Sequence, residues 1–210
     1  MQPVATKNRN YNSTRRSRQA AQTREEILTA AIVLFSESGW AGTTLAAIAE
    51  RAGVAVETIY AGFGSKKRLL RVALDVAIAG DTAEIPVADR PEARRLGEGT
   101  IDDRMHAAAE LSATVHERTL GIIRALNEAA RSDDEVEKWR HELDRARRKE
   151  VEIGLERVLG HKVTDEQFLD LIWAVLSPGV YDMLVEDAGM SRAQYESTMY
   201  DALKALRTLV

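Results

Sequence analysis

The stretch that most constrains the fold is TLAAIAERAGVAVETIY, which covers residues 44–60. It contains two short apolar segments at helical spacing, separated by Gly53. A glycine at this place can adopt the positive φ that a tight turn between two helices requires. Ile48, Val54 and Ile59 then face a core that is shared with the preceding helix. The pattern predicts a helix-turn-helix unit near the N-terminus.

The helix before this unit is predicted from a start signal and an apolar stripe. Thr23 and Glu26 have the spacing of a capping box, in which each side chain bonds to the backbone amide of the other residue. The stripe up to Gly39 consists of Ile27, Ala30, Ala31, Leu34 and Phe35. Before Thr23 stand five basic residues, no acidic residue and almost nothing to bury. We therefore expect residues 1–22 to form a flexible basic arm.

The next helix has an unusual first turn. Ser65 is a favourable N-cap, so the helix is expected to begin at Lys66 and to run to about Ala79. Its first turn holds three cations, at the end where the backbone amides already carry positive partial charge. These cations are Lys66, Lys67 and Arg68. A phosphate bound among them would remove the repulsion, and the alternative is three solvated side chains.

Charge is distributed unevenly along the chain. The first 71 residues hold 11 Lys and Arg against 5 Asp and Glu, whereas the remaining residues hold 18 against 28. A basic segment of this kind suits a polyanionic partner such as nucleic acid, and the acidic remainder suits a different task.

The rest of the chain is predicted to be helical, because helix start signals recur and no strand pattern competes with them. The expected elements are a loop and a short helix before residue 100, a long helix or a broken pair over 101–130, and helices capped at Ser132, Thr164, Ser177 and Ser191. The predicted fold class is all-α. The predicted domains are the arm (1–22), a helix-turn-helix domain (23–71) and a helical regulatory and dimerisation domain (72–210).

The sequence lacks the motifs that several classes of enzyme and metal-binding protein require. The four histidines have no metal-ligand spacing, and there is no cysteine to support them. No glycine-rich phosphate loop and no nucleophile elbow occurs. We therefore expect no catalytic residue, no metal and no cofactor. No apolar run was expected to reach the length of a membrane span, and the predicted location is the cytoplasm.

The stretch GWAGTTLAAIAERAGVAVETIYAGFGSKKRLL, residues 39–70, resembles the DNA-binding signature of the TetR family of bacterial transcriptional regulators. The shared features are Gly39-Trp40, Thr43-Thr44, Ile48-Ala49, Ala52-Gly53-Val54, Thr58-Ile59-Tyr60, Phe63, Ser65-Lys66 and Leu69-Leu70. The acidic remainder is similar to the regulatory body of actinobacterial members, notably in AIAGDTAEIPVADRP and LIWAVLSPGVYDMLV. The resemblance implies an N-terminal three-helix DNA-binding domain and a C-terminal helical domain that binds a ligand and dimerises.

Residue by residue, the resemblance implies two kinds of DNA contact. The phosphate contacts fall on Thr44, Thr58, Tyr60 and Lys66, with Arg15, Arg16 and Arg18 added from the arm. The base contacts fall on Leu45, Val56, Glu57 and Ala61 in the major groove. Three departures from the family pattern bear on base reading, namely Ala55 in place of a capping serine, Glu57 in place of a small residue, and Ala61-Gly62 in place of a bulkier pair. The alternative for Glu57 is a solvated acid at the start of its helix.

The resemblance also implies a ligand pocket and a dimer interface in the body. The candidate pocket residues are Met105, His106, Leu111, His116, Ile123, Trp139 and Trp173. The candidate interface residues are Phe168, Leu169, Ile172, Trp173, Tyr195, Met199, Leu203 and Leu206. Each residue of these sets has an alternative as ordinary intramolecular packing.

The function implied is that of a repressor that binds a palindromic DNA operator as a homodimer. An unknown small-molecule effector would release it, through a tilt of the helix that begins at Lys66. The alternatives are a ligand-independent architectural DNA-binding protein and a helical enzyme. No membrane partner is expected.

Overall fold

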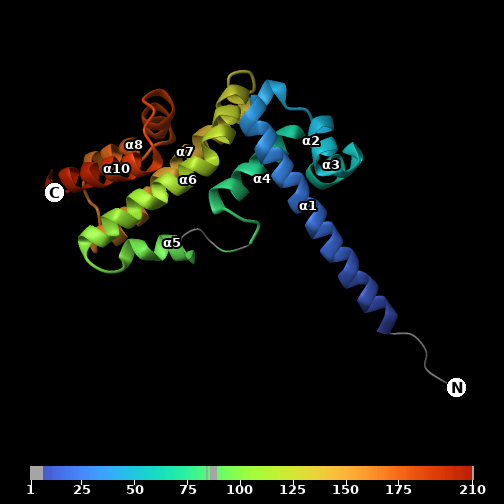
Figure 1. The fold of residues 1–210 in the computed structure, drawn as a ribbon, viewed down its shortest axis with the longest axis horizontal. Helices are drawn as coiled ribbons and strands as arrows, with labels where there is room; N and C mark the ends of the chain where they lie inside the picture. Colours follow the sequence, from blue (N-terminus) through green and yellow to red (C-terminus); the bar gives the residue numbers. More distant parts are fainter. Residues whose placement is uncertain (1–6, 84, 86–88, 210) are drawn as a thin grey trace.

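The computed structural model describes residues 7–83, 85 and 89–209, and these residues form helices and connecting loops with no strand among them. The predicted all-α fold class is thereby confirmed. The helices are α1 (Lys7–Gly42), α2 (Leu45–Ala52), α3 (Val56–Phe63), α4 (Lys66–Ala79), α5 (Pro91–Arg94), α6 (Ile101–Ala130), α7 (Asp134–Leu159), α8 (Glu166–Val175), α9 (Pro178–Tyr181) and α10 (Arg192–Leu206), with short turns η2 (Arg95–Gly97), η3 (Asp182–Asp187) and η4 (Arg207–Leu209). We call α1–α4 the head and α5–η4 the body; they lie at opposite ends of the molecule in Figure 1.

The first helix begins at Lys7, not after Thr23 as predicted. Residues 7–22 contain no glycine or proline and are rich in Ala, Gln and Arg, so nothing in this stretch stops a helix. The capping box does not form, because the side chain of Glu26 accepts a hydrogen bond from Gln22 at 3.0 Å inside the continuous helix. The part of the predicted arm from Lys7 on is therefore helical, and residues 1–6 lie outside the described residues.

Most other predicted helix starts are confirmed, including Ser65, Ser177 and Ser191, and Thr44 caps α2. Two caps lie one residue later than predicted. Asp133, not Ser132, caps α7, and Asp165, not Thr164, caps α8. An ionised carboxylate is the stronger acceptor at the positive end of a helix, which explains why the aspartates prevail. Residues 101–130 form one continuous helix.

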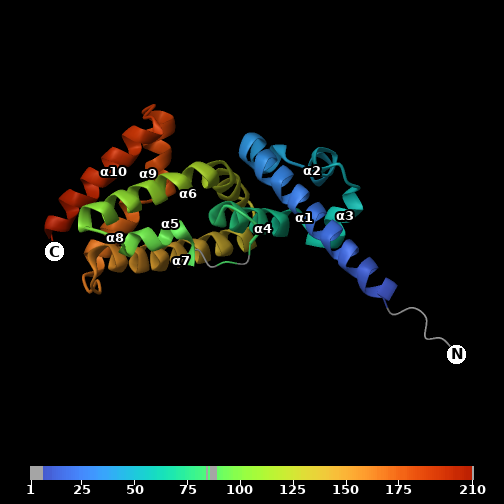
Figure 2. The ribbon, with the colours of Figure 1, turned by 60° about the horizontal axis from the view of Figure 1, so that its bottom comes forward.

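Helix α6 runs through the whole body and joins it to the head. At 1.5 Å per residue its 30 residues span about 45 Å. Its C-terminal part, from Ile122 to Ala130, packs into the same apolar cluster as the core of α1–α4. Its N-terminal part packs with α7, α8 and α10 around Met105, Phe168 and Leu203. Figure 2 shows α4 lying between α1 and the body helices α6 and α7.

The head and the body approach each other most closely where α1 crosses α6. A Cβ atom added to Gly121 of α6 would lie 2.5 Å from Cβ and 2.8 Å from Cα of Ser36 in α1. Both distances are shorter than real side chains show, so only glycine allows this crossing.

The stretch Glu166–Asp187, which covers α8, α9 and η3, is long and apolar enough to qualify as a candidate membrane span by length and composition. This corrects the expectation that no apolar run reaches such a length. Pro178 interrupts the stretch at the start of α9, and its last turn is a π-helix. Much of it is uncovered in the monomer, since Leu171 is 40% exposed and Met183 is 55% exposed.

Candidate functional site

The outer face of the head is formed by the start of α2 and by α3. Thr44 is exposed, and its side-chain oxygen accepts a hydrogen bond from the backbone amide of Ala47 at 3.0 Å. On α3 the inner side is fixed by Ile59 and Phe63, which are buried in the core. The side chains that remain exposed are Glu57, Thr58, Tyr60 and Ala61. Two hydroxyls, one carboxylate and one methyl group therefore face outward from a single short helix.

Two of the predicted base contacts are not on this face. Leu45 is buried in the head core, and Val56 is partly buried against the same cluster. Each is the first residue of its short helix, and each packs against the apolar cluster to which α1 also contributes. Ala55 caps α3 without a side-chain hydrogen bond, as the departure from the family pattern predicted.

Lys66 is also placed differently from the prediction. Its ammonium group donates a hydrogen bond to the backbone oxygen of Trp40 and lies 4.1 Å from the centre of the Trp40 ring. Burial lowers the pKa of Lys66, and the nearby charge of Glu128 acts in the opposite direction. One donor of the ammonium group is thus engaged within the head, and the side chain is partly buried.

The neighbouring cations explain how three positive charges coexist at this helix start. Lys67 forms ion pairs with Asp133 at 3.0 Å and Glu135 at 2.6 Å, at the beginning of α7. Arg68 is exposed, and none of the ion pairs found among the described residues involves it. Two of the three charges are therefore held by the fold itself.

A carboxylate of the body holds the end of α1. The helix is interrupted at Gly39, where φ is +66°. Glu128 of α6 accepts hydrogen bonds from the two following backbone amides, from Trp40 at 2.7 Å and from Ala41 at 3.1 Å. Trp40 in turn stacks on Phe35, with ring centres 6.1 Å apart. One side chain of α6 thereby fixes the segment that leads into α2.

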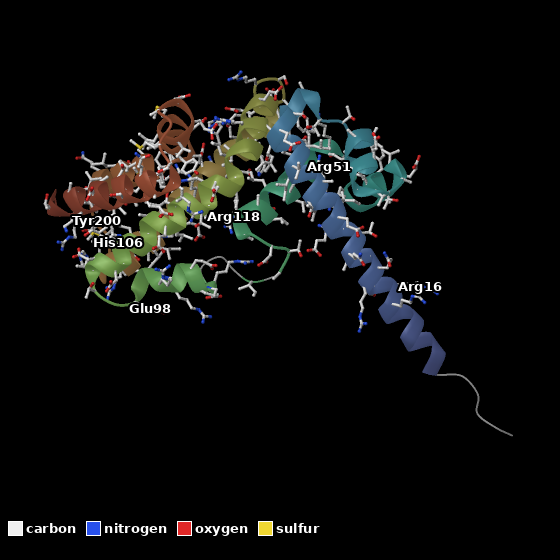
Figure 3. The ribbon with its side chains drawn as sticks, in the orientation of Figure 1. Arg16, Arg51, Glu98, His106, Arg118 and Tyr200 are labelled. Atoms are coloured by element: carbon white, nitrogen blue, oxygen red, sulfur yellow. The ribbon has the colours of Figure 1, made fainter. Side chains whose placement is uncertain are left out.

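The arginines of the predicted arm lie on the free half of α1. Arg15, Arg16 and Arg18 are exposed, and Figure 3 shows Arg16 on the part of α1 that projects away from the body. Closer to the head, the guanidinium group of Arg24 lies 4.6 Å from the centre of the Phe63 ring. This contact ties the base of the projecting helix to α3, so that the basic extension and the exposed face of α3 keep a fixed relation.

The seven predicted ligand residues do not form one group. Ile123 and Trp139 belong to the cluster between head and body, whereas Met105 and Leu111 belong to the far core. His106 is exposed and stacks on Tyr200 at 3.8 Å, at the far end of the body in Figure 3. The remaining two, His116 and Trp173, share a neighbour that the sequence analysis missed.

That neighbour is Arg147 of α7. Its Nη1 donates to the backbone oxygens of Trp173 at 3.0 Å and Leu176 at 3.3 Å, and its Cζ lies 4.7 Å from the centre of the Trp173 ring. Burial lowers the pKa of Arg147 to about 10. Burial, and then the charge of Arg147, lowers the pKa of His116 to about 4, so the imidazole is neutral at pH 7.

A hydroxyl pair continues this interior group. The Oγ of Ser112 lies 3.2 Å from Nδ1 of His116 and 2.9 Å from the hydroxyl of Tyr195. Tyr181 adds a second aromatic ring, whose centre is 5.5 Å from that of His116 and 4.7 Å from that of Tyr195. The interior of the body thus combines one cation, one neutral imidazole and several aromatic side chains.

A polar cleft lies apart from this interior group, between α5, α6 and α10. Its volume is about 180 Å³, and it is lined by Glu92, Arg95, Ala107, Glu110, Leu111, Thr114, Arg192 and Glu196. Its arginines are paired, Arg95 with Glu110 at 2.6 Å and Arg192 with Glu117 and Glu196. No group of three or more His, Asp and Glu that could hold a metal ion occurs in the part of the chain that the structure describes.

Six of the eight predicted interface residues are core residues of the single chain. They are Phe168, Leu169, Ile172, Tyr195, Met199 and Leu203, all buried. Their stripes face α6 and α7 within the monomer, so these six are not available for a partner. Trp173 and Leu206 are partly exposed, and the more exposed large apolar side chains of this region are Leu171 at 40% and Met183 at 55%.

Comparison with known proteins identifies the class of the head. Residues 27–73 match the family model described as bacterial regulatory proteins of the tetR family. No curated protein matches the sequence. Three solved structures share the fold over nearly their whole length. A proposed TetR-family transcriptional regulator from Mesorhizobium loti has a TM-score of 0.67 at 19% identity, covering 90% of this chain and 97% of that one.

The other two structures come from Rhodococcus. A transcriptional regulator from Rhodococcus sp. Rha1 has a TM-score of 0.60 at 17% identity, with 87% and 95% of the two chains covered. A TetR transcriptional regulator from Rhodococcus sp. RHA1 has a TM-score of 0.54 at 21% identity, with 90% and 96% covered. At these identities the likeness concerns the fold.

These findings define a helix-turn-helix head of the TetR type, joined to a helical body. Residues 27–73 match the TetR-family DNA-binding domain, and the chain shares the fold of solved transcriptional regulators of that family. The resemblance read from residues 39–70 is confirmed.

Proposed function

We propose that this chain is a repressor that binds a palindromic DNA operator as a homodimer and leaves it when a small molecule binds the body. The observation that carries the proposal is the exposed face of α3. A TetR-type head presents Glu57, Thr58 and Tyr60 to solvent, while its apolar side chains are buried. The site of action is then the cytoplasm, where chromosomal DNA is accessible.

The DNA contacts divide by chemistry. The hydroxyls of Thr44, Thr58 and Tyr60 suit phosphate oxygens, which accept from any donor and fix register without reading sequence. Glu57 suits the amino group of a cytosine, and the methyl group of Ala61 suits that of a thymine. Arg15, Arg16 and Arg18 add phosphate contacts from the projecting half of α1. Lys66, engaged by Trp40, is a positioning residue in this scheme.

Dimerisation is assigned to the face that carries Leu171 and Met183. Exposed apolar side chains on neighbouring elements of one region are typical of a protein–protein interface. A two-fold dimer would present two α3 helices to half-sites about 34–36 Å apart.

Release of DNA is assigned to the contacts between α6 and the head. Glu128 holds the end of α1, and the acids at the start of α7 hold Lys67 of α4. A ligand that favours a different orientation of α6 acts on both contacts at once. The ligand shifts the equilibrium by its difference in affinity for the two orientations.

The test is selection of bound fragments from genomic DNA by the purified full-length chain, followed by binding assays on the recovered site. We expect a palindrome, and Glu57→Ala should change the preferred bases while Thr58→Val weakens binding to every sequence. Glu142→Ala, an exposed acid of α7, is the matched control and should change neither. Absence of any recovered fragment at low salt would overturn the proposal.

A further inference from the structure

Arg147 is a partly buried cation without a carboxylate partner. Its helix neighbours Arg140 and Arg148 each form two ion pairs with acids, at distances between 2.5 and 3.2 Å. None of the ion pairs among the described residues involves Arg147. The charge of Asp144, one turn earlier in α7, acts to raise the pKa of Arg147, but Asp144 itself pairs with Arg140. The cost of removing the Arg147 charge from water is therefore only partly compensated within the fold.

The fold meets only part of the hydrogen-bonding capacity of Arg147. Its Nη1 donates to two carbonyls at the C-terminal end of α8, where the helix carries partial negative charge. Its Nε is buried and has no hydrogen-bond partner, and the same is true of Nε1 of Trp173, over whose ring the guanidinium lies. Two buried N–H donors on stacked side chains therefore lack acceptors, although buried donors are nearly always paired.

The surroundings restrict what can supply these acceptors. A carboxylate offers two oxygens and a negative charge, and a guanidinium binds such a group with good geometry. The neutral His116 adds no second positive charge to attract a more highly charged ion. The ring of Tyr181 lies beside His116, and the ring of Tyr195 lies beside Tyr181, so the two rings offer an apolar surface next to the imidazole.

We propose that Arg147 and Trp173 bind the carboxylate of a small organic acid whose apolar part packs against the aromatic side chains around His116. The acid is the effector, and this last step alone rests on the proposed function. Binding would draw the Arg147 guanidinium away from the carbonyls of α8 and so alter the contact between α7 and α8.

The first test is calorimetric titration of the full-length chain with two acids and their neutral counterparts. Benzoate and octanoate are the probes, with benzamide and octanamide as controls of the same shape, in buffer without sulfate or phosphate. We expect at least one acid to bind ten- to a hundredfold more tightly than its amide, because charge-assisted hydrogen bonds carry the difference. Equal binding of each acid and its amide, or no binding of either acid, would overturn the assignment.

Substitutions test whether Arg147 and Trp173 are responsible for binding of the acid. Arg147→Gln should abolish the preference for the acid, and Arg145→Gln, an exposed arginine two positions earlier, should leave it intact. Because Arg147→Gln also removes two hydrogen bonds to α8, Trp173→Phe provides a second variant that keeps an aromatic ring and removes one donor. It should weaken acid binding severalfold at an unchanged melting temperature. An unchanged affinity in both variants would contradict the site.

A separate assay distinguishes this site from the regulatory role. The bound acid is added to the complex of the chain with its selected operator, and release is followed by fluorescence anisotropy. Release that Arg147→Gln abolishes supports both proposals. Acid binding that depends on Arg147 without release supports the site and overturns its role as the effector site.

Discussion

The head and the stretch from α8 to η3 are both rich in apolar residues, but the head buries its aliphatic side chains more fully and leaves Tyr60 of α3 exposed. In the head, Phe35, Ile48 and Ile59 have no exposed surface, and the cluster around them includes residues from six helices. In the second region Leu171 and Met183 remain exposed, next to buried neighbours on the same elements. The difference teaches that a single chain completes the core of the DNA-binding half, whereas the other half retains exposed apolar surface.

The largest expected effect tests the completeness of the head core. Phe35→Ala should lower the free energy of unfolding by about 3–5 kcal/mol, because it removes a fully buried ring and leaves a cavity. Urea unfolding followed by circular dichroism measures the change. Leu171→Ala is the comparison in the exposed region and should stay within about 0.5 kcal/mol for the monomer. Similar losses in both variants would remove the contrast between the two regions.

The second prediction concerns the crossing of α1 and α6. Gly121→Ala should cost about 1–3 kcal/mol, because its methyl group meets the backbone of Ser36 and forces the two helices apart. Gly62→Ala in α3 is the control, since nothing lies within 4 Å of the added methyl group. There alanine should stabilise the helix by about 0.5–1 kcal/mol. If the two variants changed stability with the same sign, the close approach of head and body would be in doubt.

The third prediction is a dependence of stability on pH that arises in the body. The pKa of His116 is about 4 in the folded state, below the value of about 6.5 for an unfolded chain. The unfolded state therefore binds the proton first, and stability is lost as pH falls from 6.5 toward 4. We expect about 2 kcal/mol of loss between pH 7 and pH 5 from this group. His116→Gln should flatten the profile in that range, whereas His106→Gln at the exposed stack should leave it unchanged.

The smallest change in the stability of the monomer is expected for a substitution that tests the proposed dimer interface. Leu171→Ser should change the stability of the single chain by less than about 0.5 kcal/mol, yet it should weaken self-association measured by sedimentation equilibrium. Glu98→Ser, an exposed change elsewhere in the body, is the control. A dimer of unchanged affinity in Leu171→Ser would move the interface away from α8.

The sequence was a good guide to local structure, because caps and turns depend on neighbouring residues. Ser65, Ser177 and Ser191 cap their helices as predicted, and Gly53 takes a φ of +67° in the turn. The errors arose where two local signals competed. Asp133 replaces Ser132 as a cap because its charge makes it the stronger acceptor. The start of α1 was missed because a capping pattern at Thr23 was read as a boundary inside a continuous helix.

The functional residues were harder to predict, because an apolar stripe does not reveal what lies opposite. Leu45 and Leu169 were assigned to DNA and to a partner, and both pack inside the chain. Arg147 was overlooked among charged neighbours, although it occupies a helical stripe with a spacing of four residues. The other members of that stripe are Trp139, Leu143, Val151 and Leu155. The signal available in the sequence was a basic residue at a position where the helical stripe is otherwise apolar.

Because α6 is long, its two ends contact different parts of the molecule. One end lies among α7, α8 and α10, and the other carries the carboxylate that grips the backbone after Gly39. A rod of about 45 Å that tilts by roughly five degrees moves its tip by about 4 Å, slightly more than the 3.4 Å rise of one base pair. In the proposed mechanism, a tilt of this size would displace the Glu128 carboxylate, and the backbone that it holds, by a distance similar to one base-pair step.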